Sequence, residues 1–530
     1  MGFARFIAGR ILFDSDRQDR LSRPIVVIAV LGIVIGMAVM VVTLGITSGF
    51  QRSIRTKVAD ASAHLVITSI GQTDPKETPR VVIDDSLLQD LRAIPGVRHI
   101  QAYATKPGII ETPEEIQGVV VKGVGADYDW RSMGRYIVAG GPLTFSDSAR
   151  SPDVLLSKWF TDRLRINLHD TVTIYIVRGR EDIRPRKFRV GGIYETGIER
   201  IDHQLVFIDI GHLQRFSGWG LQAEIQVEDS LRPEQVRLEG LAFGGDKSYT
   251  YEWPGTTLKG QGPHWVYLWR FRDPDRDPFS ELAPPRDTTF TLVVHDDANT
   301  IPDTAWITFH PDSVRWMITS RGTEYAVQRK TIVRSGTGGS HVRYAGGFEV
   351  MTDGFEQLPQ VDHDVYRALP VNLKAESVSE RFPEIFAWLE LLDTNVIVVI
   401  VLMVIVAIIN MTSARLIIIL ERTSMIGVLK ALGSTNTTIQ RIFLIDAAFI
   451  LGVGVILGDL LGIGLCLVQQ HFGIVHLPIE SYYVDVVPVD LDLLPVFLLN
   501  AGTVVVCVLA LLLPSLLVTR IAPVKAIRFD

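Results

Sequence analysis

The sequence has few cysteines and no basic surplus, and each shortage removes a class of protein. Only two of its 530 residues are cysteine, Cys466 and Cys507, and both lie within apolar runs. So small a number excludes a disulfide scaffold and a zinc site held by cysteines. The formal net charge of −7 lacks the positive excess typical of proteins that bind nucleic acids. We therefore expect no nucleic-acid partner.

Motifs for ATP binding, metal binding and hydrolysis are also missing. The sequence has no GxxxxGK[ST] phosphate loop, no HExxH pair and no GxSxG turn. Its twelve histidines are scattered, and His203 and His310 are interpreted as turn or surface residues. We expect no catalytic residue, no metal and no cofactor in this chain, although missing motifs alone do not exclude an enzyme.

Four apolar runs are longer than the core of a globular protein requires. About 20 helical residues cross a hydrocarbon core of roughly 30 Å. The runs predict transmembrane helices at 24–46, 395–420, 442–468 and 493–518. The first run follows basic residues, as a cleaved secretory signal does. It is longer than the usual apolar segment of a signal, however, and no small-x-small site follows it closely, which favours a retained helix.

Lysine and arginine near the ends of the runs predict the orientation. The segment 1–23, expected to form an amphipathic helix, has five arginines, whereas the loop 469–492 has neither lysine nor arginine. Basic residues also lie in the connection 421–440 and in the tail 519–530. We therefore expect a multi-pass protein of an inner membrane, with both termini in the cytoplasm and residues 47–392 outside it.

The segment between the first two runs predicts a large α+β extracytoplasmic domain. Short β-branched stretches bounded by turn residues, such as TVTIYIV and KFRVGGIY, alternate with helical patterns. We expect this core domain at 47–243 and 358–392, interrupted by a β-rich insertion at 244–357. Five of the nine tryptophans lie between Trp253 and Trp316. These aromatic residues either form the core of a small β-module or line a carbohydrate or partner site.

The stretch ERTSMIGVLKALGST, Glu421–Thr435, predicts a short amphipathic helix between the second and third runs. Met425, Val428, Leu429 and Leu432 recur three or four residues apart, Gly433 suits a C-terminal cap, and TNTT offers N-caps for the next helix. Periodicity leaves two interpretations open. The helix either rests its apolar face in lipid or presents a surface to a cytoplasmic partner.

The third run contains small and acidic residues within the membrane. Gly454, Gly458 and Gly462 recur four apart and predict close helix packing. Asp459 has either a structural, cavity-facing role or a role in proton coupling, which requires a titratable partner that the other runs do not offer. Asp446 is expected to pair with the nearby Arg441.

ERTSMIGVLKALGST resembles the signature of FtsX-like permease domains in MacB-type ABC transporters. The flanking apolar runs and the ending PSLLVTRIAPVKAIRFD are similar to those permeases, and GITSGFQRSIRTKV resembles the first-helix exit of the lipoprotein-releasing Lol permeases. EEIQGVVVKGVG and DVLLSKWFTDRLRINLHDTVTIYIV resemble their periplasmic core domain. The resemblance covers residues 1–243 and 358–530, and the insertion has no counterpart.

The resemblance implies a permease that works with a separate cytoplasmic ATPase, which binds ATP and Mg²⁺, and with a second permease copy or homologue. It implies lipoprotein release toward a periplasmic carrier, with the short segment 178–186 in the place of the carrier-binding loop. Alternatives are MacB-like efflux or mechanotransmission, and an FtsX-like regulator of a cell-wall hydrolase. Ile46 and Phe50 are candidates for acyl-chain contact. The residues implied to contact the ATPase are Glu421, Arg422, Met425, Gly427, Lys430, Leu432 and Gly433.

Overall fold

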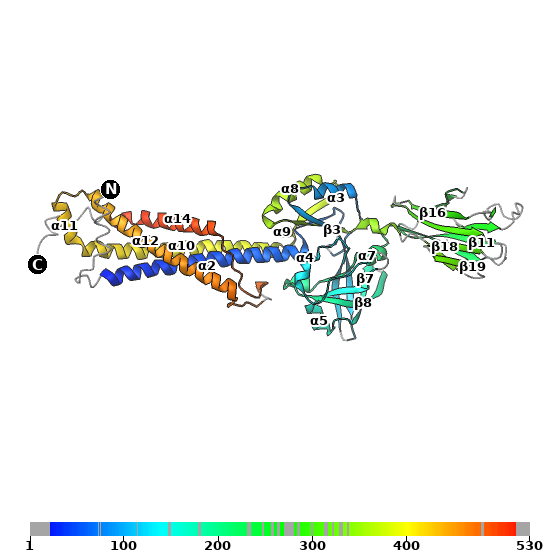
Figure 1. Cartoon of the computed structure of the whole chain (residues 1–530), viewed down its shortest axis with the longest axis horizontal. Helices are drawn as coiled ribbons and strands as arrows, with labels where there is room; N and C mark the ends of the chain where they lie inside the picture. Colours follow the sequence, from blue (N-terminus) through cyan, green and yellow to red (C-terminus); the bar gives the residue numbers. More distant parts are fainter. Residues whose placement is uncertain are drawn as a thin grey trace. The chain divides into compact units, whose positions relative to one another are not determined.

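The computed structural model describes residues 22–515 except for short internal stretches, the longest of which is 270–279. The expected helix 1–23, apart from its last two residues, and the expected tail 519–530 lie outside the described residues. The chain divides into two compact units, one formed by 1–57 with 382–530 and the other by 58–381 (Figure 1).

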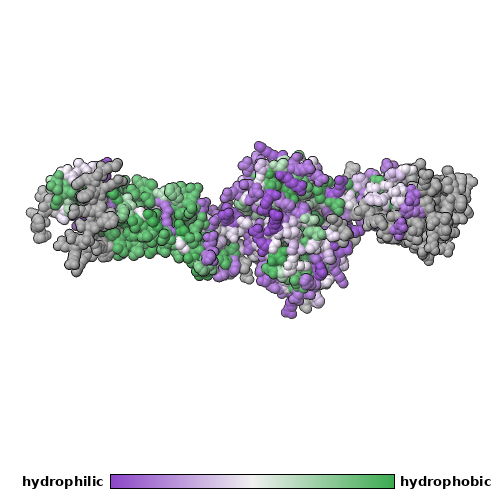
Figure 2. All heavy atoms as spheres, viewed as in Figure 1, coloured by the Kyte–Doolittle hydropathy of each residue, from purple (hydrophilic) through white to green (hydrophobic). Residues whose placement is uncertain are grey.

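The first unit is helical. In its described part, four helices are long and apolar enough to cross a membrane, and hydrophobic residues dominate the face of these helices that Figure 2 shows. Helix α2 has 41 residues and α10 has 39, so each is about 60 Å long, twice a hydrocarbon core. The bounds are α2 (Ser22–Ser62), α10 (Pro383–Glu421), α11 (Thr423–Ala431), α12 (Asn436–Phe472), α14 (Leu493–Ala510) and α15 (Leu512–Ser515).

Two of these helices continue past the expected membrane runs without a break. Helix α2 does not end at Ile46, and α10 begins at Pro383, ahead of the apolar run. At the start of α10, Ile385 and Leu389 are buried on one side of the helix. A helix continues through such a segment because polar residues tolerate helical geometry as well as apolar ones do.

Glycines let α12 pack closely against α2. A Cβ atom added at Gly458 would lie 2.5 Å from Met37 Cβ, and one at Gly454 would lie 2.7 Å from Ile33 Cγ2. Both distances are too short for real carbon atoms, so only glycine permits this approach of the two helices. The predicted role of the glycine stripe in packing is confirmed.

The second unit contains a ten-stranded mixed sheet, in the order β23-β1-β22-β3-β4-β9-β6-β8-β5, with β7 paired to β3 and β8. The pairs β4 with β9 and β6 with β8 are parallel, and the others are antiparallel. The strands are β1 (Leu65–Ser69), β3 (Val97–Glu111), β4 (Ile116–Val124), β5 (Ile137–Gly140), β6 (Asp153–Ser157), β7 (Thr171–Arg178), β8 (Asp182–Tyr194), β9 (Leu205–Asp209), β22 (Gly347–Thr352) and β23 (Leu373–Ser377).

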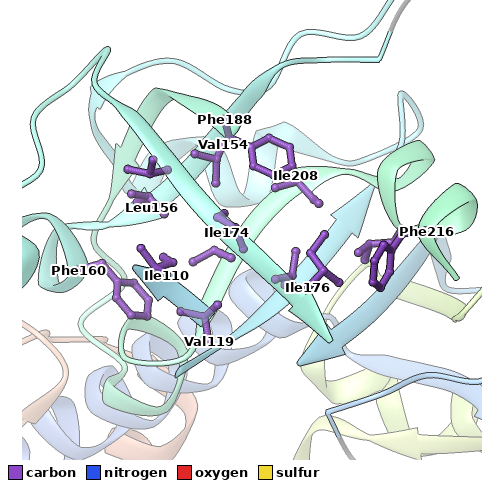
Figure 3. Close-up of a cluster of buried hydrophobic side chains, with 14 of the residues drawn as sticks. Ile110, Val119, Val154, Leu156, Phe160, Ile174, Ile176, Phe188, Ile208 and Phe216 are labelled. Atoms are coloured by element: carbon purple, nitrogen blue, oxygen red, sulfur yellow. The ribbon is translucent and has the colours of Figure 1, made fainter. Parts of the chain in front are cut away.

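Helices and a small two-stranded sheet complete this core. The sheet pairs β2 (Val81–Val82) with β21 (Tyr344–Ala345). The helices are α3 (Asp85–Arg92), α4 (Trp130–Met133), α5 (Lys158–Leu164), α6 (Glu199–Asp202), α7 (Ile210–Phe216), α8 (Leu358–Ala368) and α9 (Val378–Arg381), with the 3-10 turns η1 (Gly134–Tyr136), η2 (Ser340–Arg343) and η3 (Phe355–Gln357). Aliphatic and aromatic side chains of seven strands and two helices form one buried cluster (Figure 3).

The expected β-rich insertion is a β-sandwich whose bounds differ from the prediction of 244–357. Its two sheets run β15-β14-β11-β10-β20 and β13-β12-β16-β17-β18-β19, and they share one core. The strands are β10 (Leu221–Asp229), β11 (Gln235–Gly244), β12 (Tyr249–Glu252), β13 (Lys259–Gly260), β14 (Trp265–Trp269), β15 (Ser280–Leu282), β16 (Thr288–Asp296), β17 (Asp303–Pro311), β18 (Trp316–Ser320), β19 (Thr323–Val327) and β20 (Ile332–Ser335).

Strand pairing sets the true limits of the sandwich. Strand β10 alternates buried and half-buried residues from Leu221 onward, a pattern that predicts a strand without naming its sheet. It pairs with β11 and β20 and so belongs to the sandwich. Strand β22 pairs with β1 and β3 of the core. The insertion therefore spans residues 221–335, and the core resumes before 357.

The segment 178–186 is also more regular than expected. Strand β7 ends at Arg178 and β8 begins at Asp182, so the two strands form a hairpin in register up to that point. The connection is therefore shorter than the sequence predicted. Residues 179–181 lie outside the described residues.

Candidate functional site

The connection between α10 and α12 is a short helix with defined ends. Helix α11 stops at Gly433, whose φ of +90° places it in the left-handed region that glycine tolerates. The amide of Gly433 donates to Lys430 O and that of Ser434 to Leu429 O, each over 3.0 Å, which caps the last turn. Thr435 then caps α12, since its side chain accepts a hydrogen bond from the Thr438 amide. Both predicted caps are confirmed.

One face of α11 is buried against the ends of its neighbours. Ile426 is fully buried and packs in a cluster with Ile419 of α10 and with Ile439 and Phe443 of α12. Met425 and Leu429 pack on the edge of this cluster. Because closely packed side chains transmit displacement, a force that moves α11 acts directly on both long helices.

The opposite face of α11 is exposed and partly apolar. Leu432 is 78% exposed and Val428 is 47% exposed. The predicted apolar stripe of Met425, Val428, Leu429 and Leu432 is therefore divided between two faces, and Ile426 takes the central buried position that the prediction missed. Exposed aliphatic side chains at this place suit both expected interpretations, contact with lipid and contact with a partner.

The residues expected to contact an ATPase fall into three groups. Glu421, Leu432 and Gly433 are exposed, and Arg422, Met425 and Lys430 are half-buried. Gly427 is buried beside Ile426. The exposed surface also includes Ser424, Val428 and Ala431, which the family resemblance did not imply. Counting every third or fourth residue from Glu421 along the helix would have identified these three positions.

A buried ion pair links α10 and α12 just beyond this cluster. Arg415 Nη1 donates to Asp446 Oδ2 over 2.5 Å, and the two side chains are 3% and 5% exposed. The guanidinium also lies 5.1 Å from the centre of the Phe443 ring. The expected pairing of Asp446 with Arg441 is therefore wrong. Arg441 lies five residues before Asp446 on the same helix, whereas Arg415 faces Asp446 from the neighbouring helix.

Asp459 has a polar partner on a different helix. Asn500 Nδ2 of α14 donates to Asp459 Oδ2 over 2.6 Å. Among the described residues, Asp459 Oδ1, Asn500 Oδ1 and the hydroxyl of the nearby Thr503 have no hydrogen-bond partner. An amide donates a hydrogen bond but does not titrate near neutral pH, so Asn500 is not the titratable partner that a proton relay requires.

The turn of α2 around Ile46 and Phe50 packs against the 473–492 loop. A Cβ atom at Gly49 would lie 2.4 Å from Pro488 O, and the Asp490 amide donates to Gly45 O over 3.0 Å. The Phe50 ring lies 6.5 Å from that of Tyr482. Ile46 and Phe50 are both half-buried, so part of their apolar surface contacts protein and part remains accessible.

No group of three or more histidine, cysteine, aspartate or glutamate side chains that could hold a metal ion occurs among the residues that the structure describes. The features of the site that the structure does show are packing and contact surfaces. Its distinguishing part is α11, with a buried face against α10 and α12 and an exposed face that includes Leu432.

Two family models match this chain. The MacB-like periplasmic core domain matches residues 26–239. The FtsX-like permease C-terminal domain matches residues 397–523, which include α11, α12 and α14. The second match covers the whole helical connection described above. Most of the sandwich lies between the two matched segments.

Curated relatives are similar to this chain at low identity. The lipoprotein-releasing system transmembrane protein LolC of Xylella fastidiosa strain 9a5c is 19% identical over 95% of this chain and 93% of its own length. LolC of Neisseria meningitidis is 24% identical over 35% of this chain and 44% of its own length. LolE of Haemophilus influenzae is 24% identical over 33% of this chain and 41% of its own length.

Among solved structures, the extracellular domain of the noncanonic ABC-type transporter YknZ from Gram-positive bacteria is 14% identical. It covers 28% of this chain and 75% of its own chain at a TM-score of 0.20, too low to support an argument about the fold. The two family matches, together with the low-identity Lol relatives, place the chain in the FtsX-like, MacB-type superfamily of ABC transporter permeases.

Proposed function

We propose that this permease receives mechanical force from a separate cytoplasmic ATPase at α11 and passes it through α10 and α12 to the extracytoplasmic unit. The observation that carries the proposal is the division of α11 into two faces. Ile426 packs against both long helices, while Leu432 and Glu421 are exposed. ATP and Mg²⁺ bind to the partner in this scheme, since the chain contains no phosphate-loop motif.

Co-purification with the ATPase tests this assignment. Leu432→Glu places a charge on the exposed face, and Glu421→Ala removes one, so each variant should weaken association and reduce ATPase stimulation. Val371→Glu is the matched control, because Val371 is 94% exposed in the other unit. If both α11 variants retained normal association and stimulation, the proposed contact would be wrong.

We further propose that the cargo is an acylated lipoprotein and that the chain works as a dimer with a second copy or a homologue. The proposal is supported by the similarity to LolC and LolE, transmembrane proteins of lipoprotein-releasing systems, which extends along 95% of this chain for LolC of Xylella fastidiosa. Ile46 and Phe50 are the proposed acyl-chain contacts. Hydrophobic burial of an acyl chain there would require accessible apolar surface at the exit of α2.

Fractionation of membranes tests the cargo. Depletion of the chain should leave outer-membrane lipoproteins in the inner membrane, where the proposal places this protein with both termini in the cytoplasm. Unchanged lipoprotein fractionation combined with increased sensitivity to exported compounds would favour MacB-like efflux. Unchanged fractionation with altered cell-wall hydrolysis would favour an FtsX-like regulator.

A further inference from the structure

The extracytoplasmic unit contains a large cavity that force transmission does not require. Its volume is about 1120 Å³, which exceeds the range of roughly 300–1,000 Å³ usual for small-molecule sites. The core contributes residues of β3, α7 and η2 to the walls, and the sandwich contributes residues of β10 and β17. The cavity therefore lies where the sandwich joins the core.

Two of the arginines in the wall form no ion pair with any residue that the structure describes. Arg150 and Arg215 both line the cavity. Neither guanidinium forms a hydrogen bond or an ion pair within the described part of the chain. Burial, followed by the repulsion of Arg215 and Arg186, lowers the pKa of Arg150, although Asp209 acts in the opposite direction. The charge on Arg150 is thus not fully compensated by the protein.

Carboxylates in the same wall are already bonded to donors of the protein. Asp209 accepts from the Ser151 amide over 2.9 Å and from the Gly211 amide over 2.8 Å. Asp127 accepts from the Ala102 amide over 2.7 Å, and Glu224 accepts from the Gln222 side chain over 2.8 Å. The wall has as many acidic as basic residues. Each carboxylate already accepts at least one hydrogen bond, whereas Arg150 and Arg215 donate none to the residues that the structure describes.

Apolar and aromatic side chains line the remaining wall. Trp306 of β17 is 51% exposed, and the half-buried Phe145 contributes a second aromatic ring. Val342, beside the buried His341, is 60% exposed. An exposed tryptophan in a cavity offers a flat apolar surface with one hydrogen-bond donor.

We propose that this cavity binds an anionic amphiphile, with Arg150 and Arg215 holding its phosphate or carboxylate and Trp306 packing on its apolar part. Guanidinium groups match the planar, two-oxygen geometry of these anions and form stronger hydrogen bonds to them than neutral donors do. The ligand is either a lipid with a phosphate headgroup or a soluble organic anion. The proposal does not depend on the cargo of the permease.

Calorimetric titration of the full chain in nanodiscs of neutral lipid tests the proposal. Hexyl phosphate should bind saturably and at least tenfold more tightly than inorganic phosphate or hexanol. The double variant Arg150→Gln, Arg215→Gln should weaken the binding of hexyl phosphate at least tenfold. Trp306→Ala should reduce the difference in affinity between hexyl phosphate and inorganic phosphate. Arg367→Gln is the matched control, since Arg367 is exposed on α8 away from the cavity.

Competition separates the two sources of the ligand. Displacement of hexyl phosphate by dihexanoyl phosphatidic acid would indicate a lipid, and displacement by phenyl phosphate alone would indicate a soluble anion. Three results would overturn the proposal: no saturable binding of hexyl phosphate, tighter binding of hexanol, or unchanged affinity in a double variant whose thermal unfolding matches that of the wild type.

Discussion

Arg415 and Asp446 form a buried ion pair that joins α10 to α12 beside the cluster that holds α11. A buried pair has a high desolvation cost, and its two charges are tolerated together because each compensates the other. Movement of α11 thus reaches two helices that are already linked by packing and by charge. The pair therefore couples the movement of one helix to that of the other.

Removing one partner of this pair should strongly destabilise the helical unit. We expect Arg415→Met to lower the free energy of unfolding by about 3–5 kcal/mol, because Asp446 is left as an unpaired buried charge. The double variant Arg415→Met, Asp446→Leu should recover most of that loss. Thermal unfolding in nanodiscs measures both effects.

The control for this prediction is the exposed pair of Arg52 with Asp490, whose side chains are 77% and 35% exposed. Arg52→Met should change stability by less than about 1 kcal/mol. If Arg415→Met lowered the free energy of unfolding no more than Arg52→Met does, the buried pair would not hold α10 and α12 together.

Two glycines of α12 should respond differently to the same substitution. Gly458→Ala places a Cβ atom 2.5 Å from Met37 Cβ and should cost about 1–3 kcal/mol by overpacking. Gly452→Ala meets no atom within 4 Å and should be neutral or slightly stabilising because alanine favours helices. Thermal unfolding of the two variants compares them. Equal effects would mean that α12 does not approach α2 through the glycine stripe.

The buried and exposed faces of α11 should also separate by mutation. Ile426→Ala leaves a cavity among Ile419, Ile439 and Phe443 and should cost about 2–5 kcal/mol. Val428→Ala, on the half-exposed face, should leave stability nearly unchanged. Unfolding in nanodiscs provides the measurement. A larger loss in Val428→Ala than in Ile426→Ala would reverse the assignment of the two faces.

Local signals in the sequence predicted the parts of this site that depend on local physics. Apolar runs predict membrane helices because burial in lipid acts on each residue of the run. The end of α11 at Gly433 was also predictable, since only a positive φ is needed there. Both features depend on residues that are close together in the sequence.

Features that depend on distant partners were not predictable in the same way. The alternation in β10 predicts a strand, yet only its pairing with β20, more than one hundred residues away, assigns it to the sandwich. Asp459 and Asn500 meet across two helices, and neither run alone indicates the pair. The face of α11 that is buried depends on how α10 and α12 enclose it, so periodicity identified amphipathicity but selected Val428 and Leu432 in place of Ile426.

Buried histidines should make the stability of the extracytoplasmic unit depend on pH. Burial lowers the pKa of both His64 and His341 to about 4, with nearby arginines adding to the effect. His64 is only 7% exposed, and His341 is only 6% exposed. Each neutral imidazole therefore contributes stability that is complete above the unfolded value of about 6.5 and is lost as the pH falls toward 4.

The loss should be about 3 kcal/mol for each histidine across this range, with little further change from these groups below pH 4. His64→Gln and His341→Gln should each flatten the dependence of the unfolding free energy on pH between 6.5 and 4, whatever their effect at pH 7. Urea unfolding followed by tryptophan fluorescence at several pH values measures the slope. His363→Gln, at an exposed position of α8, should retain the wild-type slope, and a slope equally steep in all three variants would assign the pH dependence to other groups.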